Sequence, residues 1–258
     1  MYNYLEIVRS GKGTQIVLNR PAKRNAFTPG MVSELAHCLQ KCQDDDSVWW
    51  IEIHARGPVF CAGMDLLVFE NPSIEDIDLA VPPFVGSLAS AMRLVSKPTV
   101  AVVEGSVLAG GFLIVGECTL VVAKEEVTFG LPELKRGIFP FQVMDTLRKR
   151  MSDAQILQWC LLAETVSALE AQQRGLVTHV AKEGQLEEVV QSIRDRWSEL
   201  APMAMRKGIE ALRALDDIPQ ADRLIWLKSQ LEELKSSADA QEGLVAFREK
   251  RPPVWQNR

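Results

Sequence analysis

The sequence is poor in the residues from which many metal sites and nucleophilic enzymes are built. It contains only three histidines, which are scattered along the chain at His37, His54 and His179. Its five cysteines form no C-x-x-C pair and have no histidine nearby at metal-ligand spacing. A catalytic histidine and a histidine metal site are therefore poorly supported, and reduced thiols packed in a core are the favoured interpretation of the cysteines.

Long apolar runs and targeting signals are also missing. No apolar run reaches about 18 residues, so we expect no segment that spans a bilayer. The start, Met1–Gly11, lacks the basic and then apolar layout of a secretory signal. Together with the free thiols, this favours a cytoplasmic protein. A net charge of −5 gives no reason to expect nucleic acid or an anionic membrane as a partner.

The chain does contain an alternation of strand and helix patterns. Of its 258 residues, 47% are hydrophobic and 24% are charged, an ordinary composition for a globular protein. A helix is predicted after the N-cap residue Thr28, because Met31, Leu35 and Leu39 recur every fourth residue. Runs rich in Val, Ile and Trp predict four strands and one further candidate strand: Thr14–Leu18, Val48–His54, Thr99–Val103, Cys118–Ala123 and, as the further candidate, Leu176–Val180.

The last third of the chain changes character. From Gln185 to Lys250 we find no strand signal, and helical periodicity dominates. We therefore predict an α/β fold with a core over residues 1–190 and a helical region over residues 191–258. The apolar stripe Leu224–Leu234 is interpreted as core or, if the helical region is small, as a surface that is buried on a neighbouring subunit.

Two glycine-containing segments have the composition of ligand-binding turns. The first, Phe60–Leu66, follows the strand predicted around Trp49–His54, and small residues before Met64 let the backbone approach a ligand closely. The second, Glu104–Leu113, has small residues ahead of an apolar helical stretch, and the unpaired N–H groups of a helix start bind anions. A plain strand-to-helix turn and tight helix packing are the respective alternatives. The spacings of dinucleotide loops and P-loops are absent.

One carboxylate, Glu133, stands out from the remaining acids. It ends the segment Phe129-Gly130-Leu131-Pro132-Glu133, between a predicted strand end and a mostly apolar stretch. A carboxyl group in apolar surroundings has a raised pKa, which suits proton transfer. The alternative is a solvated acid that caps the start of its own helix.

Taken in this order, the segments resemble the crotonase superfamily, also called the enoyl-CoA hydratase/isomerase family, over nearly the whole chain. Asn19–Phe27 is similar to the family's N-R-P-x-x-x-N-A signature. Glu242-Gly243, Ala246-Phe247 and Glu249–Pro253 resemble its closing E-G…A-F…E-K-R motif. The resemblance implies a crotonase-like spiral of β-β-α units with a C-terminal α-helical region.

The resemblance also implies how an acyl thioester is held. Members stabilise a thioester enolate with two backbone amides, which here belong to Met64 and Gly110.

Hydratases of the family carry two glutamates. One of them matches Glu133, and the position of the other holds Leu113, which cannot transfer a proton. A single base that moves a proton between two carbons suits an enoyl-CoA isomerase, which shifts a Δ3 double bond to Δ2. Phe141, where a glycine is usual, favours a drier pocket and the same reaction.

Two other functions stay open. An enoyl-CoA hydratase would use Glu133 alone or with another acid, and we considered Asp65, Glu117 and Asp145, of which Asp65 is better explained as a helix cap. A non-catalytic acyl-CoA binding protein would have kept the fold and lost half of the machinery. The dienoyl isomerase pattern is absent, because both positions of its extra aspartates are apolar here.

Coenzyme A is expected as part of the substrate, with no prosthetic group and no metal or redox cofactor implied by the resemblance. Cations suit its phosphates, although solvated surface charge is the alternative for Arg24 and Arg251. In the family, the closing Lys and Phe often act from a neighbouring subunit. The residues expected to bind coenzyme A are Lys23, Arg24, Ala26, Ala62, Asp65, Leu66, Phe247 and Lys250.

The resemblance further implies assembly as a homotrimer or a dimer of trimers. The substrate thioester is expected on coenzyme A, with an acyl carrier protein as an open alternative. The predicted helix Pro72–Val95, which Pro82-Pro83 interrupts, is expected to border the acyl chain.

Overall fold

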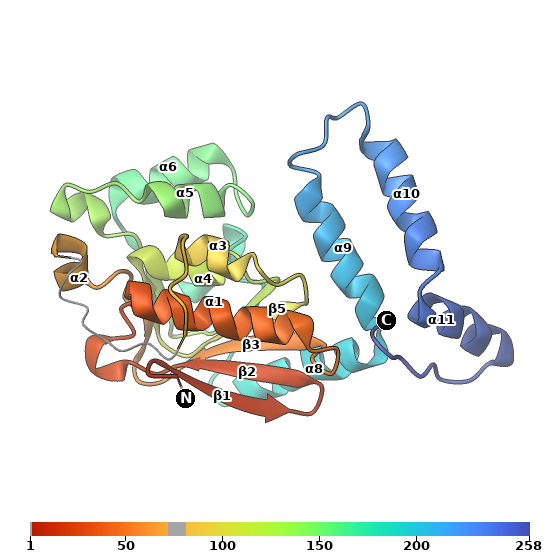
Figure 1. The fold of residues 1–258 in the computed structure, drawn as a ribbon. Coiled ribbons are helices and arrows are strands. Elements are labelled where there is room, and N and C mark those ends of the chain that lie inside the picture. The colour runs from red at the N-terminus through yellow and green to blue at the C-terminus, as the bar shows by residue number, and fades with distance from the viewer. Residues whose placement is uncertain (1, 72–80) are drawn as a thin grey trace.

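The computed structural model describes residues 2–71 and 81–258. The predicted helix Pro72–Val95 begins outside the described residues, and its described part contains the short helix α3 (Leu88–Met92). Two sheets wrapped by helices form one body, and further helices stand beside it (Figure 1). Within the described residues, no helix is long and apolar enough to cross a membrane.

The larger sheet has the strand order β1-β2-β3-β5-β7-β10. β1 and β2 form an antiparallel hairpin, and the remaining pairs are parallel. The four strands predicted over residues 14–18, 48–54, 99–103 and 118–123 are confirmed, with small shifts at their ends. The strands are β1 (Leu5–Ser10), β2 (Gly13–Leu18), β3 (Trp50–Ala55), β5 (Thr99–Val103), β7 (Leu120–Lys124) and β10 (His179–Ala181).

The further candidate strand, Leu176–Val180, is wrong in its first part. β10 begins only at His179. The N–H groups of Leu176 and Val177 donate to the carbonyl oxygen of Ala171 at 3.0 and 3.3 Å, which closes the end of α7 (Ala168–Gln173). Both side chains are buried in the core. Their apolar pattern therefore reflects burial of a turn rather than strand pairing.

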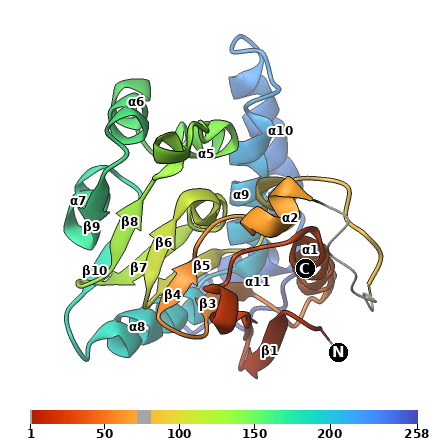
Figure 2. The same cartoon turned by 90° about the vertical axis from the view of Figure 1, so that its left-hand side faces the viewer.

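A second sheet of short strands has the order β4-β6-β8-β9. Each of its first three strands follows a strand of the larger sheet and leads into a helix, giving the repeats β3-β4-α2, β5-β6-α4 and β7-β8-α5. The predicted spiral of β-β-α units is therefore confirmed (Figure 2). The elements are β4 (Val59–Cys61), β6 (Ser106–Leu108), β8 (Thr128–Gly130), β9 (Thr165–Ser167), α2 (Leu66–Glu70), α4 (Phe112–Val115) and α5 (Phe141–Leu147).

The helix predicted after Thr28 is α1 (Pro29–Asp44), and its start has the expected cap. The hydroxyl of Thr28 accepts the N–H of Met31 at 3.2 Å. Met31, Leu35 and Leu39 are buried in the core that α1 shares with the larger sheet. α6 (Asp153–Leu162) also packs its buried side chains into this core, and a capping box at Ser152 stabilises the start of the helix.

The opposite face of the larger sheet is covered by α8 (Leu186–Glu199). Leu186, Val190 and Ile193 of this helix pack on the sheet in a second buried cluster. Arg194 also donates to both carboxylate oxygens of Glu52, on β3, at 2.7 Å. The predicted division at residue 190 stays a prediction, and its boundary falls inside this helix.

Helices follow α8 to the end of the chain, in agreement with the absence of a strand signal. They stand beside the sheets, on the right-hand side of Figure 1. Of their described side chains, only Pro202, Asp239 and Ala246 are buried. The helices are α9 (Pro202–Ala214), α10 (Arg223–Lys235) and α11 (Ala238–Glu249).

Candidate active site

The three predicted segments lie at one edge of the smaller sheet. β4, β6 and β8 are neighbouring parallel strands, so their carboxyl ends meet on the same side. Met64 follows β4, Gly110 follows β6 and Glu133 follows β8. In open parallel sheets, ligands bind outside such carboxyl ends. The structure therefore brings together residues that are up to 69 positions apart in the chain (133 minus 64).

Gly63 and Gly110 are in close contact. Gly63 has φ +91°, a conformation that favours glycine, and a Cβ there would lie 2.8 Å from the Cβ of Ala109 and 3.0 Å from the nitrogen of Gly110. The segment after β4 and the segment after β6 are thus packed backbone against backbone. Only a residue without a side chain fits at position 63.

The amides of Met64 and Gly110 have no hydrogen-bond partner among the described residues. Phe27 forms a parallel bridge to Met64: the N–H of Phe27 donates to the carbonyl oxygen of Gly63, and the N–H of Asp65 donates to the carbonyl oxygen of Phe27. In such a bridge the N–H of Met64 points away from Phe27. Gly110 lies in the first turn of the 3₁₀ helix η3 (Ala109–Gly111), where N–H groups have no partner within the helix. Within residues 2–71 and 81–258, neither N–H donates to a protein acceptor.

Glu133 begins the 3₁₀ helix η4 (Glu133–Arg136) directly after Pro132. Its Oε2 atom is buried and has no hydrogen-bond partner among the described residues. Burial raises the pKa of Glu133, and its own backbone N–H and the charge of Arg136 offset this only in part. The carboxyl is therefore a desolvated group whose pKa lies above its ordinary value, as suits a group that accepts and then releases a proton.

A cysteine that the sequence did not single out lies near Glu133. Cys160, on α6, is fully buried, and burial followed by the charge of Glu133 raises the pKa of its thiol to about 11. The thiol is therefore neutral at physiological pH. Because 27 residues separate it from Glu133 (160 minus 133), no local motif could have indicated this proximity.

The other acids considered for catalysis are held by structural partners. Glu117 accepts hydrogen bonds from Arg93 at 2.6 Å and from Thr146 at 3.1 Å. Asp145 lies 3.3 Å from Arg93, and its side chain is 68% exposed. Leu113, at the position of the second family glutamate, is buried on α4. Glu133 is thus the one acid among the described residues that has a buried carboxylate oxygen without a hydrogen-bond partner.

Asp65 caps α2, as the sequence predicted. Its carboxylate accepts the N–H of Leu67 at 3.1 Å and pairs with Arg20 at 2.7 Å. Burial raises the pKa of Asp65, but the hydrogen bond and charge of Arg20 outweigh it, so the net pKa is lowered. The group is a fixed anion, and its assignment to coenzyme A stays a prediction.

The remaining residues predicted to bind coenzyme A fall into two groups. Lys23 and Arg24 are exposed, Ala26 follows them, Ala62 donates its N–H to the carbonyl oxygen of Arg24 at 3.0 Å, and Leu66 begins α2. This first group belongs to two segments that the hydrogen bond between Ala62 and Arg24 joins, one of which contains Met64. The second group, Phe247 and Lys250, lies at the end of α11, on the opposite side of the molecule from α2 (Figure 1). Within one chain the structure does not bring the two groups together.

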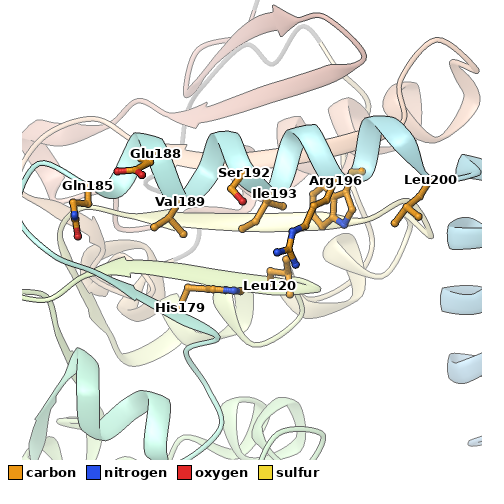
Figure 3. A pocket seen from close by; sticks show the side chains of 10 residues that line it. Leu120, His179, Gln185, Glu188, Val189, Ser192, Ile193, Arg196 and Leu200 are labelled. Atoms are coloured by element: carbon orange, nitrogen blue, oxygen red, sulfur yellow. The ribbon is translucent and has the colours of Figure 1, made fainter. Parts of the chain in front are cut away.

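A surface pocket of about 570 Å³ lies elsewhere, between α8 and the strands β7 and β10 (Figure 3). It shares no lining residue with the candidate site. Among the described residues, no group of three or more His, Cys, Asp or Glu side chains is arranged to hold a metal ion. The pocket is lined by Leu120, His179, Gln185, Glu188, Val189, Ser192, Ile193, Arg196, Trp197 and Leu200.

Comparison with known proteins identifies the family of this chain. The family model described as enoyl-CoA hydratase/isomerase matches residues 11–258. An enoyl-CoA hydratase from Mycobacterium tuberculosis is 30% identical over 262 residues, which cover 98% of this chain and 96% of the relative. The 2,3-dehydroadipyl-CoA hydratase of Escherichia coli is 27% identical, with 98% and 99% covered. A crystal structure of an enoyl-CoA hydratase from Mycobacterium tuberculosis matches with a TM-score of 0.86 and 26% identity over 99% of both chains.

A spiral of β-β-α units with a C-terminal helical region defines the crotonase class of proteins. This chain belongs to the enoyl-CoA hydratase/isomerase family.

Proposed function

We propose that this protein is an enoyl-CoA isomerase that shifts a Δ3 double bond to Δ2, with Glu133 as the proton shuttle. The observation that carries the proposal is Oε2 of Glu133, the one buried carboxylate oxygen without a partner among the described residues, at the sheet edge where the amides of Met64 and Gly110 lie. An isomerase needs one base, whereas joint activation of a water and delivery of a proton uses two acids. Leu113 supplies no second acid.

In this proposal the thioester oxygen accepts hydrogen bonds from the N–H groups of Met64 and Gly110. Glu133 removes a proton from C2 of the 3-enoyl group, and the electrons of the C–H bond form an enolate whose charge the two amides stabilise. The same carboxyl then returns the proton to C4, so that the double bond lies between C2 and C3. The raised pKa of Glu133 supports both steps, because a base must later act as the acid.

A hydratase is the second candidate, and the names of the relatives favour it. The relatives from Mycobacterium tuberculosis and Escherichia coli are both named hydratases. In that reaction a water adds across the C2–C3 bond, with Glu133 acting alone. The distinction therefore depends on whether Glu133 moves a proton between carbons or activates a water.

The test is to supply purified protein with 3-enoyl-CoA and, separately, with 2-enoyl-CoA. We expect conversion of 3-enoyl-CoA to 2-enoyl-CoA, with hydration much slower, and loss of activity in Glu133→Gln. Asp145→Asn, at an exposed acid, is the matched control and should keep the activity. Isomerase activity retained in Glu133→Gln would refute the assignment, and acyl-CoA binding without turnover of either substrate would indicate a non-catalytic binder.

The proposed enzyme is a homotrimer or a dimer of trimers, in which α9–α11 bury their apolar side chains on a second copy of the chain. Leu212, Leu224, Ile225 and Phe247 are 71–84% exposed, which is unusual for so many large apolar groups on adjacent helices. Such packing would also carry Phe247 and Lys250 to a neighbouring subunit, where they would meet the first group of coenzyme A residues around Met64.

A further inference from the structure

We infer that Phe27 is a positioning residue that sets the distance and direction between the two amides proposed to hold the thioester oxygen. This inference rests on the proposed function, because it concerns the same pair of amides. Phe27 is 8% exposed and belongs to the segment after η1 (Pro21–Lys23), outside both glycine segments. It contacts one of these segments with its backbone and the other with its ring.

The backbone of Phe27 fixes the segment that contains Met64. Its N–H donates to the carbonyl oxygen of Gly63 at 2.8 Å, and its carbonyl oxygen accepts the N–H of Asp65 at 2.9 Å. The two peptide groups on either side of Met64 are thereby held, which fixes the direction of the Met64 N–H.

The ring of Phe27 packs on the segment that contains Gly110. A Cβ on Gly110 would lie 2.8 Å from Cε1 and 3.0 Å from Cζ of Phe27, whereas its next neighbour, the α-carbon of Gly63, is at 3.6 Å. The ring therefore fills the space where any larger residue at position 110 would place its side chain. A ring attached to a fixed backbone is a rigid stop for the Gly110 segment.

Two polar side chains hold Phe27 itself in place. Arg20 donates to the carbonyl oxygen of Ala26 at 2.9 Å and to the carboxylate of Asp65 at 2.7 Å, which ties the residue before Phe27 to the residue after Met64. Asn25 is fully buried, and its amide donates to the carbonyl oxygens of Arg56 and Val59 at 2.8 Å. The support for Phe27 is therefore anchored to the start of β4 as well.

The kinetic test uses Phe27→Leu and Phe27→Ala, which keep the backbone bridge and shorten or remove the ring. Because a preorganised pair of donors acts mainly on the transition state, we expect kcat to fall about 10- to 100-fold in Phe27→Ala, with KM changed less than about 3-fold. Leu39→Ala, in the same core on α1, is the control for loss of stability alone and should keep its kcat when folded. An unchanged kcat in folded Phe27→Ala would overturn the inference.

A spectroscopic readout separates positioning from folding. Crotonyl-CoA bound to Glu133→Gln, which blocks turnover, should have a carbonyl stretch at lower frequency than in water, because two N–H donors polarise the bond. We expect Phe27→Leu in the same background to lose most of that shift. If the Glu133→Gln protein itself shows no shift or no binding, the proposed function fails. If the shift is present and Phe27→Leu leaves it intact, only the inference about Phe27 fails.

The contact with Gly110 is tested from the other side by Gly110→Ala. The added methyl group collides with the Phe27 ring, so kcat should fall, and Phe27→Leu in the double variant should relieve the collision. We expect the double variant to lose less than the product of the two single losses. If the loss of kcat in the double variant equals the product of the two single losses, the proposed contact is overturned.

Discussion

Gly63 approaches Gly110 so closely that a Cβ on Gly63 would lie 3.0 Å from the Gly110 nitrogen. This contact joins the segments after β4 and β6, which carry the two free amides. The spacing of the amides therefore depends on the absence of a side chain at position 63, and this dependence can be measured.

We expect Gly63→Ala to lower both activity and stability. The methyl group meets the Cβ of Ala109 at 2.8 Å, and φ +91° strains any residue other than glycine, at a cost of about 1–3 kcal/mol. Moving one amide should lower kcat/KM about 100-fold. Gly184→Ala is the matched control, because its φ of +75° gives similar strain with open space around it. Equal activities of the two variants would contradict the account.

The raised pKa of Glu133 predicts where activity is lost on acidification. The carboxylate is the form that removes the proton, so kcat/KM should rise with pH through the pKa of Glu133 in the folded protein. Because burial raises this pKa above its ordinary value of 4.5, the acid limb should lie above pH 4.5. The measurement is kcat/KM as a function of pH, with a substrate that binds tightly and is converted slowly. An acid limb at or below pH 4.5 would show that the carboxyl is solvated.

A carboxylate at position 113 should move the reaction toward hydration. Leu113→Glu restores an acid at the position of the second family glutamate, and general acid–base assistance of this kind is worth about 10²–10⁴-fold. We expect hydration of crotonyl-CoA to increase at least about 10-fold while isomerisation falls. Leu113→Gln, with the same shape and no proton to transfer, is the control. A similar change in both variants would show that shape rather than acidity controls the outcome.

The attachment of α8 to the sheet should depend on the pair Arg194–Glu52. Burial raises the pKa of Glu52, but hydrogen bonds from Arg194 and His54 outweigh it and hold the pKa at about 2. The pair therefore stabilises the fold above pH 4.5, and this contribution is lost as the pH falls from 4.5 toward 2.

Arg194→Met should accordingly lower the free energy of unfolding by about 3–5 kcal/mol at pH 7, because it leaves the buried carboxylate of Glu52 without its cation. The difference from the unmodified protein should shrink below pH 4.5, as measured by urea unfolding at several pH values. Glu187→Gln, at the exposed partner of Arg194, should cost less than about 1 kcal/mol. A pH-independent loss in Arg194→Met would mean that packing rather than charge is responsible.

The proposed assembly predicts that charge on α10 disrupts it. Leu224 and Ile225 are 80% and 74% exposed in the single chain, so Leu224→Asp and Ile225→Asp should leave the fold intact and lower the oligomeric state in sedimentation velocity. If Phe247 and Lys250 act across the interface, KM for acyl-CoA should rise about 10-fold or more in the dissociated protein, since charge-assisted contacts to phosphate are lost. A monomeric unmodified protein would contradict the proposal.

Much of this arrangement could be predicted from the sequence, and the reasons are local. Thr28 caps the start of α1, and Met31, Leu35 and Leu39 recur every fourth residue along the helix. Both features are local to this segment, so the sequence alone predicts the helix. Strands of five or six residues, such as Thr99–Val103, have enough β-branched residues to be recognised. The three-residue strands β4, β6 and β8 are too short to produce a pattern, although they are the elements that bring the site together.

The candidate site shows the same limit. Gly63, Gly110 and Glu133 lie in recognisable segments, and their residue types indicate what each can do. The contacts of Phe27 with Gly63 and Gly110, and the proximity of Cys160 to Glu133, depend on how distant segments pack. Contacts between distant segments produce no characteristic residue spacing, so the sequence does not predict them. The sequence also could not show that Arg20 and Asn25 hold the segment of Phe27 in place. A motif shows which residues occur together, but it does not show which atoms they bind.

The most direct test of the central claim follows one proton. The protein is given 3-enoyl-CoA with deuterium at C2 in ordinary water, and the product is analysed by mass spectrometry and NMR. A single shuttle at Glu133 predicts 2-enoyl-CoA that carries deuterium at C4. Unconverted 3-enoyl-CoA, or 2-enoyl-CoA that carries only solvent hydrogen at C4, would contradict the account.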